Sequence, residues 1–393
     1  MPSALLAATA PAASALHEEL LTLDTHLDTP LHLARPGWDI LQRHSPDQDP
    51  AQVDWPRMVE GGLDGGFWVV FTPQGPRTPA GYVAARDYAL QVTLRIREMV
   101  ARNHDKFELA TTAEDAERIV AAGKRVVYIS IENGYPLVHD PTLLKTFHDL
   151  GVRMLGLVHT AHNDLADSST DLRGSQDGKE WGGLSPLGRQ LIVESNRLGI
   201  LLDASHASDD VLDQMIALSR APIILSHSGC KAVYDHPRNV DDQRLRKLAA
   251  AGGVIQMNSL SEYLAPLPVD PRRGAAIAQL MARYGDLATL TPEKLQELMQ
   301  QRHALGMEYP APKATFEDYM RHLLHALEVV GPDHVGIGAD WDGGGGVTDM
   351  PDVASIPEIT EHLLRAGYSR QDLEKIWGGN VLRLLRQVAA LRQ

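Results

Sequence analysis

Hydrophobic residues in this chain fall into eight short runs, and most of the runs are followed by a stretch with helical spacing. A strand that is apolar on both faces is buried on both, as in a parallel sheet covered by helices. Helical spacing is clearest at 79–103, 186–198 and 316–330. The eight runs lie at residues 21–28, 65–71, 125–132, 152–159, 200–206, 222–227, 253–258 and 334–340.

Eight consecutive strand–helix units favour a closed barrel over an open, doubly wound sheet. We therefore predict the α/β class and a (β/α)8 barrel of the TIM type. No break in composition marks a domain boundary, so residues 1–393 are predicted to form one domain. Residues 1–18 are predicted to be an N-terminal arm or a first helix. Residues 261–315, rich in proline and partly helical in pattern, are predicted to be a lid-like insertion after the seventh strand.

Charge and composition narrow the classes of partner. The chain has 37 Lys and Arg against 51 Asp and Glu, a net charge of −14, which disfavours nucleic acids and anionic membranes. No run approaches the roughly 20 apolar residues of a membrane helix. Residues 1–16 lack the basic start of a signal peptide, so we predict a cytoplasmic protein, with export to the periplasm as the alternative. The single cysteine, Cys230, excludes an internal disulfide.

Polar residues gather where these strands end. In a barrel of this type, the carboxyl ends of all strands meet at one mouth, so side chains far apart in the sequence should converge there. Four imidazoles and three carboxylates at equivalent positions are a set that chance seldom produces. They are His26, Asp28, Glu132, His159, His206, His227 and Asp340.

This set suits a pair of zinc ions. His26 and Asp28 are two residues apart, so they point the same way in a strand. Together with His206 and His227 they supply the nitrogen and oxygen donors that zinc prefers. Glu132 is the candidate for a carboxylate that bridges two metals, and Asp340 is the candidate proton shuttle.

Several of these residues lie in longer motifs. The chain resembles the membrane (renal) dipeptidase family, peptidase family M19, among the amidohydrolase-type barrels, from about Leu21 to Leu385 and in the same order. The matching stretches are Asp24-Thr25-His26-Leu27-Asp28, Ile131-Glu132-Asn133-Gly134, Leu157-Val158-His159-Thr160, Leu202-Asp203-Ala204-Ser205-His206, Ser226-His227-Ser228 with Arg238-Asn239-Val240, Gly336-Ile337-Gly338-Ala339-Asp340-Trp341-Asp342-Gly343 and Gly378-Gly379-Asn380.

The resemblance implies a role for each residue. His26 and Asp28 would bind one zinc, His206 and His227 the other, and Glu132 would bridge them. The resemblance further implies that His159 contacts the scissile carbonyl or its oxyanion, that Arg238 holds the free carboxylate of a dipeptide, and that Asp340 carries the proton. Tyr263 is a candidate for an aromatic residue near the substrate.

For the whole protein, the resemblance implies a zinc-dependent dipeptidase, active on L,L- and also L,D-dipeptides, in which a metal-bridging hydroxide attacks the peptide. It also implies a homodimer. The alternatives are another binuclear metal amidohydrolase, such as an N-acyl amino acid hydrolase, a lactonase or a deaminase, and a non-catalytic zinc-binding protein.

Other features are predicted to be structural. His322 and His325 lie three apart on the helix at 316–330 and are predicted to be solvent-exposed. Cys230 is predicted to be a small buried residue. The run Gly343-Gly344-Gly345-Gly346 is predicted to be a flexible loop beside the mouth. His162 is either a second-layer partner or a simple loop residue, and Asp342 is predicted to orient a ligand.

Overall fold

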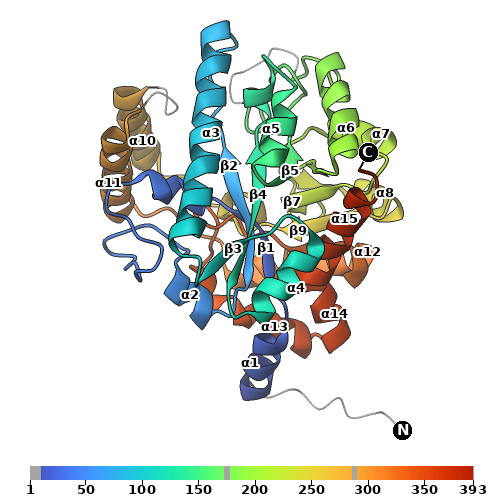
Figure 1. The fold of residues 1–393 in the computed structure, drawn as a ribbon. Coiled ribbons are helices and arrows are strands. Elements are labelled where there is room, and N and C mark those ends of the chain that lie inside the picture. The colour runs from blue at the N-terminus through green and yellow to red at the C-terminus, as the bar shows by residue number, and fades with distance from the viewer. Residues whose placement is uncertain (1–9, 172–177, 286–289, 393) are drawn as a thin grey trace.

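The computed structural model describes residues 10–171, 178–285 and 290–392. Eight parallel strands follow one another around a nearly closed barrel, which confirms the predicted fold class (Figure 1). Each strand pairs in parallel with the next along the path. In order they are β1 (Leu23–Leu27), β2 (Gly65–Phe71), β4 (Arg125–Glu132), β5 (Val152–Gly156), β6 (Leu201–Asp203), β7 (Ile224–Cys230), β9 (Val254–Met257) and β10 (Val335–Ile337).

The first and last strands of the barrel are joined mostly by residues that lie outside the regular strand pairing. Leu27 forms an isolated parallel bridge with Trp341, and the Asp28 backbone N–H donates to the Trp341 carbonyl at 2.8 Å. The Thr25 hydroxyl of β1 also lies 3.3 Å from the Ile337 carbonyl of β10. Closure therefore ties the segment around His26 to the segment around Asp340.

Helices cover the outside of the barrel, as the spacing predicts. The connecting helices are α3 (Pro79–Arg102), α5 (Leu143–Asp149), α6 (Pro186–Leu198), α7 (Asp209–Leu218), α8 (Asp242–Ala250) and α12 (Phe316–Val330). The tail forms α13 (Pro357–Arg365), α14 (Arg370–Glu374), a π-helical turn (Lys375–Gly379) and α15 (Asn380–Ala389). No helix in the described ranges has the length and apolar character needed to cross a membrane.

The core has two parts, and one of them lies near the amino ends of the barrel strands. One buried cluster draws a residue from near the start of seven strands and covers them with α15. Because these side chains fill the amino ends of the strands, the opposite ends are free for polar groups. The strand residues are Leu23, Phe67, Tyr128, Met154, Leu201, Ile224 and Val254, and they meet Val381, Leu385 and Val388 of α15.

Two segments flank the barrel. Helix α1 (Ala10–Glu19) packs beside α13, and its buried His17 contacts the Thr360 hydroxyl and the Gly61 carbonyl (Figure 1). Residues 1–9 of the predicted arm at 1–18 lie outside the described residues. The insertion forms the short α9 (Ser261–Leu264) and a hairpin of α10 (Pro271–Tyr284) and α11 (Pro292–Glu308), drawn at the left of Figure 1.

Some elements differ from the prediction. Strand β3 (Phe107–Leu109) pairs with β4 outside the barrel path and leads into α4 (Ala113–Ala121). The sequence signal for α4 is a capping box at its start, in which the Thr112 hydroxyl and the Asp115 carboxylate each accept a hydrogen bond from the other residue's backbone N–H.

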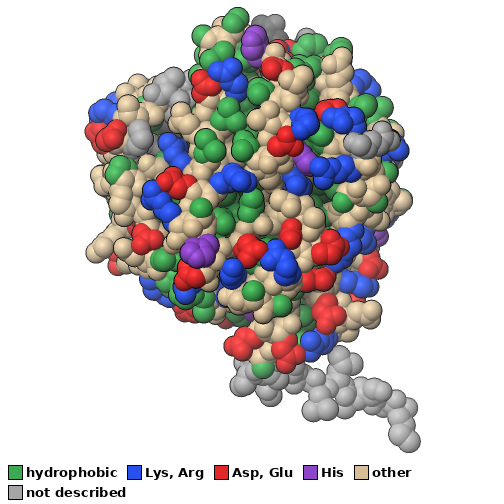
Figure 2. All heavy atoms as spheres, viewed as in Figure 1, with side chains coloured by type: hydrophobic (Ala, Val, Ile, Leu, Met, Phe, Trp, Pro, Cys, Tyr) green, Lys and Arg blue, Asp and Glu red, His purple; other side chains and the backbone are tan. Residues whose placement is uncertain are grey.

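The molecular surface carries charges of both signs. On the face in Figure 2, acidic and basic side chains are interspersed.

The prediction that His322 is solvent-exposed is wrong. Its side chain is fully buried, because α12 turns this face toward β7 and α9. Nδ1 accepts from the Cys230 backbone N–H at 2.9 Å, and Nε2–H donates to the Leu264 carbonyl at 3.0 Å. His325 is half-buried and pairs with Asp242 at 2.8 Å. Cys230 is buried, as predicted.

Replacing His322 by Leu should lower the free energy of unfolding by about 2–4 kcal/mol, because it leaves a buried N–H and a buried carbonyl unpaired. Denaturant midpoints of the metal-free protein measure this. His325→Leu is the matched control and should cost less than about 1 kcal/mol, since it removes a half-exposed ion pair. Equal losses in the two variants would contradict the structural role of His322.

The same residue predicts a pH dependence. Burial lowers the pKa of His322 to about 4, so the folded state holds it neutral while the unfolded state binds a proton below about pH 6.5. Its contribution is therefore present above pH 6.5 and is lost as the pH falls toward 4. The difference in stability between wild type and His322→Leu should shrink over this interval, by up to about 3 kcal/mol.

Candidate metal centre

The seven polar residues predicted at the strand ends meet at one end of the barrel. His26 lies in β1, Glu132 is the last residue of β4, and His227 lies in β7. The others lie one to three residues beyond strand ends, where the chain leaves the sheet. These are Asp28, His159, His206 and Asp340.

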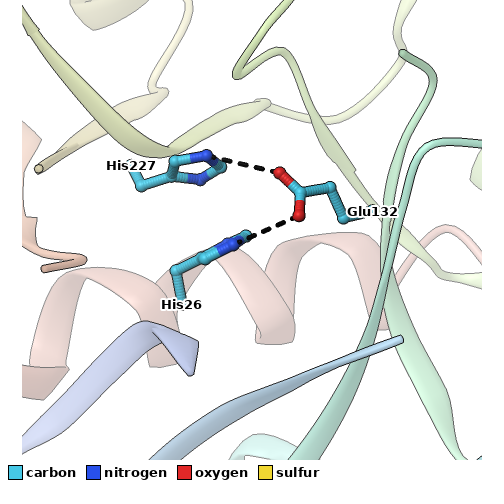
Figure 3. Close-up of side chains that lie close together, drawn as sticks. All are labelled: His26, Glu132 and His227. Atoms are coloured by element: carbon cyan, nitrogen blue, oxygen red, sulfur yellow. Dashed lines mark ion pairs between the residues drawn. The ribbon is translucent and has the colours of Figure 1, made fainter. Parts of the chain in front are cut away.

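Glu132 lies between two groups of donor atoms (Figure 3). Its Oε2 lies 3.4 Å from His26 Nε2, while its Oε1 lies 3.0 Å from His206 Nε2 and 3.4 Å from His227 Nε2. On the far side, His26 Nε2 lies 3.4 Å from Asp28 Oδ2. Oε2 of Glu132 thus faces the side of His26 and Asp28, and Oε1 faces the imidazoles of His206 and His227.

The spacing of these atoms fits metal coordination. Two donors about 2.0–2.1 Å from one tetrahedral zinc ion lie roughly 3.3 Å apart. The Nε2 atoms of His206 and His227 lie 2.9 Å apart, and the donor contacts of Glu132 and Asp28 span 3.0–3.4 Å. Asp28 Oδ1 is buried with no hydrogen-bond partner in the described part of the chain. Buried carboxylates are expected to be paired or to coordinate a cation, so this donor set fits divalent metal ions.

The electrostatics of the imidazoles agree with this fit. Burial, reinforced by the Arg238 guanidinium, holds the pKa of His206 and of His227 well below the usual range. Both rings are therefore neutral at pH 7, which is the form that binds a metal. Burial opposes the charged form of His26 as well, but the carboxylates of Glu132 and Asp28 raise the pKa of its ring well above normal.

The remaining two residues lie at the edges of this group. His159 Nε2 lies 3.9 Å from Glu132 Oε1, and its side chain is 24% exposed, the most open of the seven. Asp340 Oδ1 lies 3.9 Å from His26 Nε2. Burial and the neighbouring carboxylates of Asp28 and Glu132 raise the pKa of Asp340 well above its usual range. The carboxyl of Asp340 therefore binds a proton more readily than that of a free aspartate.

Arg238 lies beside this group and is only 3% exposed. Its Nη2 donates to the His227 carbonyl at 3.0 Å, its guanidinium lies 5.2 Å from the centre of the Tyr263 ring, and its Nε has no partner among the described residues. None of the described carboxylates pairs with it. A buried cation without a partner anion is costly, which makes Arg238 a candidate binding group for a carboxylate.

Comparison with known proteins decides the family. The sequence model described as membrane dipeptidase (peptidase family M19) matches residues 11–393. Dipeptidase tcpJ of Claviceps purpurea is 31% identical over 376 residues, 93% of this chain and 76% of that protein. The crystal structure of the probable dipeptidase PvdM from Pseudomonas aeruginosa has a TM-score of 0.81 at 32% identity, and the match covers 97% of this chain and 98% of that one.

The chain belongs to the membrane dipeptidase family. It is a metallopeptidase that hydrolyses peptide bonds. At the level of fold alone, it is also similar to a metallo peptidase from Rhodobacter sphaeroides solved with a phosphinate mimic of the dipeptide L-Ala-D-Ala. That structure has a TM-score of 0.72 at 24% identity, and the match covers 94% of this chain and 99% of that one.

The dipeptidase places two of these residues with unusual backbone geometry. His206 and Asp340 have φ values of 66° and 65°, in the left-handed region that non-glycine residues seldom adopt. The His206 carbonyl is held by the Ser169 backbone N–H at 2.8 Å. Such strain costs of order 1–3 kcal/mol for each residue and persists only where the surroundings fix it. Both residues are therefore aimed by the loops that follow their strands.

Asp24 links the first strand of the barrel to the segment that follows the last strand. Its Oδ1 accepts from the His26 backbone N–H at 2.8 Å, and its Oδ2 accepts from the Ala339 backbone N–H at 3.0 Å. Burial raises the pKa of Asp24 to about 7. This carboxylate fixes the residue before Asp340 relative to His26, a role that its place in the Asp24–Asp28 motif did not reveal.

Two predicted accessory residues lie in a second layer. Asp342 accepts from the Thr29 hydroxyl at 2.7 Å and from the Gln52 backbone N–H at 2.6 Å, so it anchors the residue after Asp28. His162 Nδ1 accepts from the Ser168 backbone N–H at 2.9 Å. The Ser168 hydroxyl in turn reaches the carbonyls of His159 and His206.

The glycine run at 343–346 is anchored, which differs from the predicted flexible loop. The Gly345 N–H donates to the Asp340 carbonyl at 2.8 Å, and the Gly346 N–H donates to the Ser259 hydroxyl at 2.7 Å. A Cβ placed on Gly343 would overlap with both Asp28 Oδ2 and Asp340 Oδ1. Gly343 therefore gives these two carboxylates the room they occupy.

Gly343→Ala should lower kcat/KM for dipeptides by at least about 100-fold, because a displacement of about 1 Å in a catalytic group costs that much. The control is Gly306→Ala in α11, where an added Cβ meets no atom within 4 Å. That variant should keep its activity within about twofold and be slightly more stable. Wild-type kinetics in Gly343→Ala would show that Asp28 and Asp340 need no fixed positions.

Proposed function

We propose that this dipeptidase is zinc-dependent and binds two ions per chain. His26 and Asp28 would hold one, His206 and His227 the other, and Glu132 would bridge them. The observation that carries the proposal is the position of Glu132, whose two oxygens face the two donor groups at 3.0–3.4 Å. Nitrogen and oxygen donors in tetrahedral spacing favour zinc over the harder magnesium and calcium ions, which prefer oxygen donors alone.

Two bound zinc ions would polarise the scissile carbonyl and lower the pKa of the attacking water. In the reaction, the water oxygen adds to the carbonyl carbon, the C–N bond breaks, and the leaving nitrogen gains a proton. Asp340 suits this transfer, because its raised pKa allows Oδ1 to take the proton from water and give it to the amine. His159, at the open edge, would donate a hydrogen bond to the developing oxyanion.

Arg238 would bind the free carboxylate of the substrate. A guanidinium binds a carboxylate through paired hydrogen bonds, and the absence of a described carboxylate partner leaves it free to do so. The Tyr263 ring would keep the guanidinium in place from one side. A carboxylate held beside His227 restricts substrates to short peptides.

We further propose that the enzyme accepts both L,L- and L,D-dipeptides. The Rhodobacter sphaeroides peptidase was solved with a mimic of L-Ala-D-Ala, and this substrate is therefore included in the test.

Purified protein should contain two zinc ions per chain and release amino acids from L-Ala-L-Ala and L-Ala-D-Ala. Metal content is measured by plasma mass spectrometry and product by amino acid analysis. Dialysis against a chelator should abolish hydrolysis, and added zinc should restore it, because both carbonyl polarisation and water activation depend on the ions. Full activity in protein that holds no metal would contradict the proposal.

Arg238→Ala should lower kcat/KM for dipeptides by about 100- to 1000-fold, the loss expected for a buried charge-assisted pair of about 3–4 kcal/mol. Hydrolysis of a neutral ester lacking a carboxylate should hardly change. The matched control is Arg244→Ala, whose guanidinium already pairs with Asp209, Asp213 and Asp241. Equal losses on both substrates would point to a structural role or to a lactonase-type preference.

A further inference from the structure

Asp203 is a buried carboxylate outside the set of residues already assigned. It is the last residue of β6, and it faces the start of β7. Its Oδ1 accepts two backbone N–H groups, from Ser205 and from Ser226, each at 2.9 Å. Its Oδ2 accepts the Ser226 hydroxyl at 2.5 Å. The three donor atoms that Asp203 accepts from thus belong to the segment just after β6 and to the neighbouring strand β7.

The hydrogen bonds have a direction that continues to a candidate metal ligand. Ser226 Oγ lies 2.8 Å from His227 Nδ1. A hydroxyl has one hydrogen to donate, and a carboxylate can only accept, so the Ser226 hydrogen points to Asp203. His227 Nδ1 must then be the donor to Ser226 Oγ. This leaves the lone pair on Nε2, the atom that faces Glu132 and His206.

The other two imidazoles lack such an anchor. The Nδ1 atoms of His26 and His206 are buried and have no hydrogen-bond partner among the described residues. His206 is held instead through its backbone, whose carbonyl accepts from Ser169. Of these three rings, only that of His227 has a hydrogen-bond partner for Nδ1 among the described residues, so a change at Asp203 should act on one side of the centre.

We propose that Asp203 is a positioning residue that acts through Ser226 to fix the tautomer of His227, and so sets the affinity of the metal position formed by His206 and His227. The proposal rests on the binuclear centre proposed above. Groups that hydrogen-bond the second nitrogen of a metal-binding histidine typically change metal affinity by 10- to 100-fold when they are replaced.

Asp203 also has a structural role, which a test must separate. Strands β6 and β7 share one registered residue pair, Asp203 with Ile224, and the carboxylate extends this short ladder by accepting the two backbone N–H groups. Loss of stability alone therefore says nothing about the tautomer. The informative variant keeps the shape and the backbone contacts while it reverses the direction of the hydrogen bonds.

Asp203→Asn is that variant. The two backbone N–H donors require the amide oxygen at the position of Oδ1, which places the NH2 group beside Ser226 Oγ. Ser226 then accepts from the amide and donates its own hydrogen to His227 Nδ1. The ring proton moves to Nε2, the atom that should bind the metal. Ser226→Ala, in contrast, only removes the anchor and leaves the tautomer free.

The experiment measures zinc binding to the full chain by competition with a fluorescent chelator, and the tautomer of His227 by 15N NMR of histidine-labelled, metal-free protein. In wild type we expect two zinc ions and a proton on Nδ1. Asp203→Asn should weaken one of the two ions by about 100-fold and move the proton to Nε2. Ser226→Ala should weaken the same ion by about tenfold.

Ser205→Ala is the matched control. Its hydroxyl accepts from the His227 backbone N–H at 3.0 Å and lies 3.4 Å from Ser226 Oγ, which is much farther than the 2.5 Å between Ser226 Oγ and Asp203, and it has no hydrogen bond to the ring in the described structure. It should keep both zinc affinities within about threefold. Thermal melts of all metal-free variants report whether the fold is kept. Should Asp203→Asn fail to fold, Ser226→Ala alone decides the outcome through its affinity and its NMR signals.

The outcomes separate the two proposals. A wild-type protein that binds no zinc overturns the proposed function. A wild type with two zinc ions, together with unchanged affinity in Ser226→Ala or a greater loss there than in a folded Asp203→Asn, overturns the role of Asp203. Weakening of both ions equally in Asp203→Asn also overturns it, because the relay reaches only His227.

Discussion

The cost of burying charge governs this structure. Three carboxylates and four imidazoles share one pocket, and Asp28, Glu132 and Asp340 are each less than a tenth exposed. Charges removed from water in this way are stable only when they are paired with one another or bound to cations. The imidazoles provide part of the compensation, as the depressed pKa of Glu132 shows. The rest of the molecule has to keep these groups at distances that a bound cation can satisfy.

The barrel meets this requirement because the two ends of its strands have different roles. Near their amino ends, large apolar side chains such as Phe67 and Tyr128 pack against α15 and supply the burial that stabilises the fold. At the carboxyl ends, the chain leaves the sheet through conformations that would be unfavourable elsewhere, including the left-handed backbone of His206 and Asp340. Stability gained at one end thus offsets strain at the other.

Much of this arrangement was predictable from the sequence, because it depends on local pattern. Buried parallel strands are continuous apolar runs, so their ends, and with them His26 and Glu132, can be located from the pattern alone. The burial of His322 was not predictable, since two histidines three apart on a helix give the same sequence pattern whichever side of the helix faces the barrel. Strand β3 was missed because three residues are too short to show a period. Asp203 lies in one of the family motifs, but the sequence does not show that its carboxylate accepts from the backbone of Ser205 and Ser226.

Arg238 shows most clearly where pattern ends and three-dimensional structure begins. In the sequence it is one of many arginines, and only its likeness to a family motif set it apart. In the structure it is a buried cation that donates to the carbonyl of His227, itself a member of the clustered imidazoles and carboxylates that could hold a metal ion. The cluster that favours a cation and the guanidinium that favours an anion are therefore neighbours in space, joined through His227. A peptide can satisfy both only if its free carboxylate lies close to the bond that is cut, and this geometry supports a preference for dipeptides over longer chains.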